Sequence, residues 1–172
     1  PYTANEQLNY AVYTSTSSYY ASTYQDIIDN QGSQRLLALH QALEAHPVQH
    51  RTHKLYQSDP LEAVVGNVSN DNFSLTVSGY FIPQESGTYT FTCEGDDGVF
   101  FLLNGSVVAS HPGGHGTSSI GTHTGTISLT AGTKYTLNAY MQEDGGGIGL
   151  RIFWKTPSNS TWTIHANEIS SE

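Results

Sequence analysis

The sequence predicts an all-β protein, an antiparallel, jelly-roll-like β-sandwich with a small helix-containing insertion near its N-terminus. From residue 61 onward, segments of roughly five to eleven residues alternate between apolar and polar positions and are separated by turn residues, as antiparallel strands require. The chain contains 17 Gly and 11 Tyr, and only 12% of its residues are charged. Its 172 residues are about the length of one domain. We therefore expect residues 1–172 to form a single β-sandwich domain.

Charge and hydropathy exclude two classes of partner. The 6 Lys and Arg against 15 Asp and Glu give a net charge of −9, and so few cations cannot neutralise a nucleic-acid backbone. No run of about 18 apolar residues exists that could span a membrane. We expect no nucleic-acid partner and no membrane insertion. The acidic excess suits a bound cation or simple solubility, and composition leaves both open.

Residues 1–60 lack regular alternation, and one helix stands out among them. Ser33 is its expected N-cap, and Pro47 ends the pattern. The periodic positions, three or four residues apart as on one helix face, are Leu36, Leu37, His40 and Leu43. The polar residues between them predict a helix on the surface.

The strands follow in order after this insertion. They are expected at Asn72–Ile82, Thr88–Cys93, Val99–Leu103, Ser106–Ser110, Thr124–Thr130, Lys134–Met141, Gly149–Lys155 and Thr161–His165. Asn104-Gly105 predicts a tight hairpin because both residues tolerate a positive φ. Ala131-Gly132 predicts a second pair, formed by the strands on either side of it. The alternation places Cys93, the single cysteine, on a buried face as an inert thiol.

Two acidic, glycine-flanked loops exceed what a turn requires. The first is Glu94-Gly95-Asp96-Asp97-Gly98, and the second begins at Gln142 and contains three consecutive glycines. A plain turn needs one Asp or Asn with a Gly, whereas calcium takes carboxylate, amide and main-chain oxygens. Each loop alone is also consistent with an ordinary surface turn. Because both follow strands of a sheet, they can emerge at one end of a sandwich, and calcium is then the natural metal.

Five segments, taken in order, resemble a known family. They are Val77-Ser-Gly-Tyr-Phe-Ile-Pro83, Ser86-Gly-Thr-Tyr-Thr-Phe91, Asp96-Asp97-Gly98, Leu129-Thr-Ala-Gly-Thr-Lys-Tyr135 and Leu150-Arg-Ile-Phe-Trp154. Their order is similar to that of the protective-antigen-type β-sandwich (the PA-fourteen domain), which occurs in toxins, glycosidases and cell-surface adhesins. The resemblance covers about residues 70–170 and is loose over residues 5–60.

The resemblance implies a calcium site. In the lectin branch of the family, two aspartates joined by a cis peptide bond bind Ca²⁺, and they align with Asp96 and Asp97. A second loop supplies one amide side chain and then two main-chain carbonyls, which fall on Gln142, Asp144 and Gly146. Gln142 departs from the Asn of fungal members, so its side chain or its carbonyl is the expected ligand.

The resemblance also implies a function. It indicates a calcium-dependent lectin module of a cell-surface adhesin, which binds terminal sugars of the glucose, fucose or mannose type through vicinal hydroxyls on Ca²⁺, on host, microbial or biofilm glycans. The sugar is expected to contact Asp97, Glu143, Asp144, Gly145 and His115. The lone cysteine contrasts with the disulfide-rich fungal members, so the chain resembles a secreted bacterial member, a monomeric module of a larger extracellular protein.

Other interpretations remain open at this point. His111 and His115 lie in a long glycine-rich loop, where they either line the sugar or are simply solvated. The domain is alternatively a structural or protein-interaction spacer with a purely structural calcium, or the carbohydrate-binding module of a glycoside hydrolase. No nucleophile elbow or phosphate-binding glycine loop occurs, and adjacent aspartates cannot flank a glycosidic bond. We therefore expect no enzymatic activity.

Overall fold

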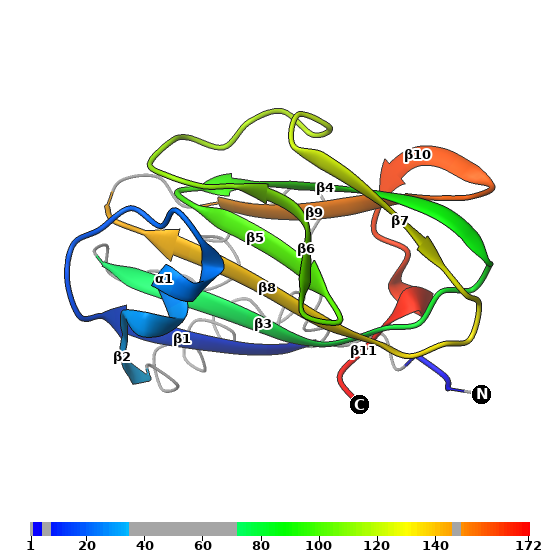
Figure 1. The fold of residues 1–172 in the computed structure, drawn as a ribbon, viewed down its shortest axis with the longest axis horizontal. Coiled ribbons are helices and arrows are strands. Elements are labelled where there is room, and N and C mark those ends of the chain that lie inside the picture. Colours follow the sequence, from blue (N-terminus) through cyan, green and yellow to red (C-terminus); the bar gives the residue numbers. More distant parts are fainter. Residues whose placement is uncertain (1, 5–7, 35–71, 146–148) are drawn as a thin grey trace, which may run out of the picture.

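The computed structural model describes residues 2–4, 8–34, 72–145 and 149–172. Its elements are β1 (Asn9–Ser15), α1 (Tyr24–Asp29), β2 (Gln31–Gln34), β3 (Phe73–Phe81), β4 (Gly87–Asp96), β5 (Val99–Leu103), β6 (Ser106–His111), β7 (Thr124–Leu129), β8 (Tyr135–Glu143), β9 (Gly149–Thr156), β10 (Asn159–Thr163), a 3₁₀ turn (Ala166–Glu168) and β11 (Ile169–Ser170). The predicted all-β class is confirmed (Figure 1).

Two antiparallel sheets form the sandwich. The first sheet has the strand order β2-β1-β3-β8-β5-β6, with β11 paired to β3, and we call it sheet A. The second has the order β10-β9-β4-β7, and we call it sheet B. Within the described residues, no helix is long and apolar enough to cross a membrane.

Aromatic side chains from both sheets meet in the core. Phe81 of β3 and Phe101 of β5 come from sheet A, and Phe91 of β4 and Trp154 of β9 come from sheet B. The rings of Phe81 and Trp154 pack edge to face with their centroids 5.3 Å apart, and Phe91 stacks on Phe101 at 4.7 Å. Cys93 is fully buried in the same cluster, as its alternation predicted. These contacts hold the sheets face to face.

The Asn104-Gly105 hairpin is confirmed, and the second predicted pair is wrong. β5 pairs with β6 around Asn104 and Gly105, which have φ angles of 48° and 80°. By contrast, β7 pairs with β4 in sheet B, while both edges of β8 are occupied by β3 and β5 in sheet A. The turn at Ala131-Gly132 is therefore a crossover between the sheets. Turn residues signal a change of direction, but they do not say which strand the chain will pair with next.

The N-terminal helix of the structure is not the predicted one. Ser33, the expected N-cap, lies in strand β2, and the rest of the predicted helix falls outside the described residues. Among the described residues the structure contains the short helix α1, which was not predicted and where Thr23 and Asp26 form a capping box. This Thr-x-x-Asp spacing is a readable signal, but six residues are too few to show a helical period.

Candidate functional site

Two crossovers between the sheets run side by side at one end of the sandwich. The chain leaves sheet B after Asp96 of β4 and enters sheet A at Val99 of β5, while it leaves sheet A after Glu143 of β8 and returns to sheet B at Gly149. Asp96 pairs with Gly149, and Val99 pairs with Met141. Figure 1 shows the arrowheads of β4 and β8 at the same end, beside α1 and the loop that precedes it. The expectation that the two acidic loops meet at one end is therefore confirmed.

Asp96, Asp97 and Glu143 form what we call the carboxylate cluster. Each offers one carboxylate oxygen, and these oxygens lie within 4.8 Å of one another. The Asp96–Asp97 peptide bond is cis, as the resemblance implied. Asp97 is 7% exposed and Glu143 is fully buried. Such convergent oxygens match the ligands that a hard cation prefers.

Hydrogen bonds fix the orientation of Asp97. Its Oδ1 accepts from the backbone N–H of His115 at 3.0 Å, and its Oδ2 accepts from the backbone N–H of Asp144, also at 3.0 Å. Its own backbone N–H donates to the carbonyl of Gln142 at 2.9 Å. Both acidic loops and the loop of His115 are thus tied to one carboxylate.

Glu143 has the surroundings expected of a cation ligand. Its Oε1 accepts from the N–H of Gly145, while its Oε2 is buried and has no hydrogen-bond partner among the described residues. Burial raises the pKa of Glu143 to about 8, and repulsion from Asp97, Asp96 and Asp144 acts in the same direction. Burial and the Asp97 carboxylate likewise raise the pKa of Asp96 to about 6. A bound cation would offset this repulsion, so the residues present fit a calcium ion.

Gln142 occupies a different position from the one expected. Its side chain is buried and is bound to the N-terminal segment. Oε1 accepts from the N–H of Ala21 at 3.2 Å, and Nε2 donates to the carbonyl of Tyr19 at 2.7 Å. Its carbonyl already accepts from Asp97. The amide therefore binds the N-terminal segment, and the side chain that joins the aspartates is Glu143, which the sequence suggested only as a sugar contact.

The other predicted residues lie around the cluster. Oδ1 of Asp144 accepts from Ser18 Oγ at 2.7 Å, and Gly145 donates to Glu143 as described. The ring of His115 contacts the carbonyls of His111 and Gly116, so it is held within its own loop. Gly146 lies outside the described residues.

Sequence reasoning missed the segment that precedes α1. Tyr19 and Ala21 bind Gln142, and the carbonyl of Ala21 accepts from Gly113 at 2.8 Å. Tyr20 between them is 59% exposed, and its ring lies against Gly114, where a Cβ atom would come within 2.5 Å of it. An exposed tyrosine at this place adds an aromatic face beside Gly114, the neighbour of the residue that bonds to Asp97. Only the tyrosine-rich composition of the segment hinted at such a role.

Comparison with known proteins identifies the family. The family model that describes the PA14 domain matches residues 65–167 of this sequence. The chain belongs to the PA14 domain family. A search of curated protein sequences finds no match.

Solved structures of similar proteins share this fold. The PA14 domain of the MpAFP antifreeze protein superposes with a TM-score of 0.65 at 13% identity, covering 99% of this chain and 93% of that one. A PA14 sugar-binding domain from an RTX adhesin gives 0.61 at 14% identity, with 96% and 99% covered. The A domain of Epithelial Adhesin 9 from Candida glabrata, solved with Galβ1-4GlcNAc, gives 0.57 at 14% identity, with 95% and 87% covered. At these identities the likeness shows the fold.

Proposed function

We propose that this PA14 domain is a calcium-dependent carbohydrate-binding module of an extracellular, cell-surface adhesin, without catalytic activity of its own. The observation that carries the proposal is the carboxylate cluster, where the fully buried Glu143 offers a carboxylate oxygen within 4.8 Å of oxygens of Asp96 and Asp97, and where its Oε2 has no hydrogen-bond partner in the described part of the chain. Two of the similar structures are described as a sugar-binding adhesin domain and as an adhesin complexed with a glycan, which supports the same role.

Asp96, Asp97 and Glu143 would hold the calcium ion. Bound calcium supplies a positive centre with free coordination positions, to which vicinal sugar hydroxyls can bind in place of water. The protein fixes the ligands beforehand, because Asp97 is held by the N–H groups of His115 and Asp144. The hydrogen bond from Ser18 orients Asp144 at the rim, where a carboxylate can accept from the same sugar.

Tyr20 extends this site. Its exposed ring stands beside Gly114, next to the residue that bonds to Asp97. Sugars present an apolar C–H face as well as hydroxyls, and an aromatic ring is a suitable contact for that face. The proposed ligands are terminal sugars of the glucose, fucose or mannose type. Because little apolar area is buried, we expect a single-site Kd in the high micromolar to millimolar range, on the order of 10⁻⁴ to 10⁻³ M.

A glycan array tests the proposal. The domain is displayed multivalently to raise avidity, and binding is measured in calcium and again in excess chelator. We expect binding to glycans that share one terminal diol, and we expect it to disappear with chelator and in the Asp96→Asn and Asp97→Asn variants. Asp29→Asn is the matched control, since Asp29 is an exposed carboxylate on α1. Tyr20→Ala should weaken sugar binding while leaving calcium binding unchanged.

The outcomes separate the alternatives. Calcium-dependent sugar binding that survives in both aspartate variants would contradict the site. Binding that resists chelator would contradict the role of calcium. If calcium binds, as measured by titration calorimetry, and yet no glycan is retained, the domain is a spacer or protein-interaction module with a structural calcium.

A further inference from the structure

Three histidine rings stack outside sheet B, and none of them is part of the carboxylate cluster. His111 ends β6, His123 directly precedes β7, and His115 lies in the loop between them. The His111 and His115 ring centroids are 3.3 Å apart, and those of His111 and His123 are 3.7 Å apart, with nearly parallel planes. The two ends of the loop between β6 and β7 therefore lie next to each other.

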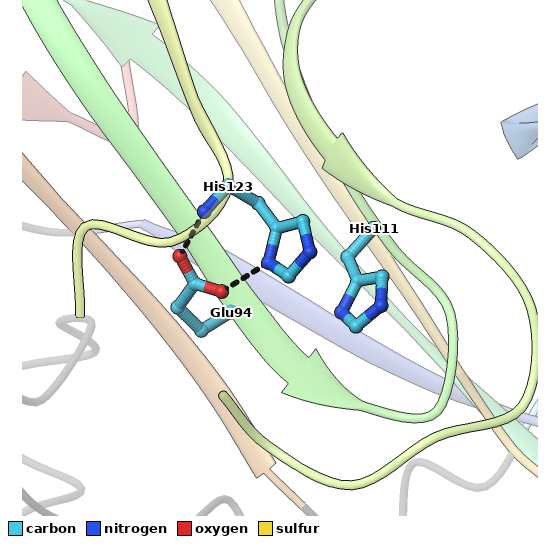
Figure 2. Close-up of side chains that lie close together, drawn as sticks. All are labelled: Glu94, His111 and His123. Atoms are coloured by element: carbon cyan, nitrogen blue, oxygen red, sulfur yellow. Dashed lines mark hydrogen bonds and ion pairs between the residues drawn. The ribbon is translucent and has the colours of Figure 1, made fainter. Parts of the chain in front are cut away.

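A buried glutamate lies beneath these rings. Cys93 faces the core, so the next residue of β4, Glu94, points to the opposite face of the sheet. Its Oε2 accepts from Thr92 Oγ1 at 2.5 Å and from the backbone N–H of His123 at 2.8 Å. Its Oε1 lies 2.5 Å from His123 Nδ1 (Figure 2). These bonds fix the carboxylate with one oxygen toward the histidines.

Glu94, His111 and His123 offer three ligand atoms to a common centre. Their oxygen and nitrogen atoms lie within 4.8 Å of one another. His111 Nδ1 is buried, and no residue that the structure describes forms a hydrogen bond with it. Burial and the neighbouring His115 and His123 lower the pKa of His111, which favours the neutral imidazole that binds metals.

We propose that Glu94, His111 and His123 form a binding site for a divalent transition metal of the zinc type. Two imidazoles with one carboxylate are a zinc ligand set that leaves a fourth position open, whereas calcium selects oxygen ligands. Imidazole lone pairs lie in the ring plane, so binding turns His111 and His123 out of their parallel stack. When the His111 ring rotates, its Nδ1 gives up no hydrogen bond to a described residue. At His123 the metal replaces the proton that Nδ1 shares with Glu94.

The metal would fix the loop between β6 and β7. The two histidines that would bind the metal stand at the beginning and the end of this loop, and the third ligand, Glu94, belongs to β4. The same loop carries His115, whose backbone N–H donates to Asp97 at 3.0 Å. Metal at this site therefore holds in place one of the hydrogen bonds that orient the carboxylate cluster.

Zinc binding in excess calcium tests the proposal. Equilibrium dialysis counts Zn²⁺ per chain for the wild type and for the His111→Gln and His123→Gln variants, and circular dichroism verifies that each is folded. The chain has 8 His, so the readout is the difference between proteins. We expect each variant to lose one zinc ion, or to bind it about tenfold or more weakly. Cobalt(II) in place of zinc should give a visible absorption band that both variants lack.

His165→Gln is the matched control. His165 is a partly buried histidine beside Trp154, and it belongs to neither cluster. This variant should bind zinc and cobalt as the wild type does. Equal zinc stoichiometry and affinity in the wild type, His111→Gln and His123→Gln would overturn the proposal, as would complete displacement of zinc by excess calcium. Because both test positions are only partly buried, they are safer to change than Glu94.

Discussion

At the scale of single residues, a buried carboxylate organises part of the molecule outside the carboxylate cluster. Glu168 is 1% exposed. Its Oε2 accepts from the Tyr89 hydroxyl at 2.5 Å and from the backbone N–H of Gln84 at 2.8 Å, while Oε1 accepts from Trp154 Nε1 at 3.0 Å. The side chain thus joins the C-terminal 3₁₀ turn to β4 and β9.

Removing this carboxylate should destabilise the fold. Glu168→Ala removes the acceptor of two buried donors, the Tyr89 hydroxyl and Trp154 Nε1, and an unsatisfied buried polar group costs about 1–3 kcal/mol. We expect the free energy of unfolding in urea to fall by roughly 3 kcal/mol or more. Glu85→Ala is the control, because among the described residues its carboxylate accepts a hydrogen bond from the exposed Ser158 hydroxyl alone, and it should change stability by less than about 0.5 kcal/mol. Equal unfolding midpoints for the two variants would show that Glu168 has no such role.

At the scale of elements, the β5–β6 hairpin depends on one glycine. Gly105 has a φ of +80°, and no atom lies within 4 Å of the position that a Cβ would take. Any cost of Gly105→Ala therefore comes from the backbone, at about 1–2 kcal/mol for a left-handed L-residue. Gly116 is equally open and has no such φ, so Gly116→Ala should leave the thermal midpoint nearly unchanged. A similar midpoint for both variants would contradict this assignment.

Hairpins and crossovers differ in how well sequence predicts them. Asn104-Gly105 specified both the turn and the pairing of β5 with β6, because a two-residue turn brings the two adjacent strands side by side. The longer connection around Gly132 showed the same apolar alternation on either side, yet it changes sheets. Helix α1 was missed because it is held by a capping box rather than by a periodic face. Local chemistry was readable, while pairing over a distance was not.

At the scale of the whole molecule, the sequence predicted the position of the candidate site, but it predicted only some of the residues that form the site. Paired acidic loops after two strands indicated one end of a sandwich, where the structure brings them together. The sequence placed the Gln142 side chain beside the aspartates, where the structure has Glu143, a shift of one residue. Successive side chains of a strand point to opposite faces. Glu143 therefore lies beside Asp97, while Gln142 binds the N-terminal segment. That segment folds against the site through contacts that no local pattern encodes.

The carboxylate cluster should also make metal-free stability depend on pH. The folded protein holds the pKa of Glu143 at about 8, above its ordinary value of 4.5. The folded state therefore binds a proton that the unfolded state has lost between these two values, and stability falls as the pH rises through this range. Glu143→Gln removes the charge, so in chelator its free energy of unfolding relative to the wild type should increase from pH 5 to pH 8.

Calcium should reverse the order of stability of the wild type and Glu143→Gln at pH 8. Because the ion needs the ionised carboxylates, it should raise the thermal midpoint of the wild type at pH 8 and leave Glu143→Gln nearly unchanged. Glu85→Gln controls for the loss of one partly exposed negative charge from a chain of net charge −9, and it should show neither effect. A difference between the wild type and Glu143→Gln that stays constant from pH 5 to pH 8 in chelator would mean that this carboxylate does not titrate in the folded protein. The buried oxygen of Glu143 would then have a partner other than a cation.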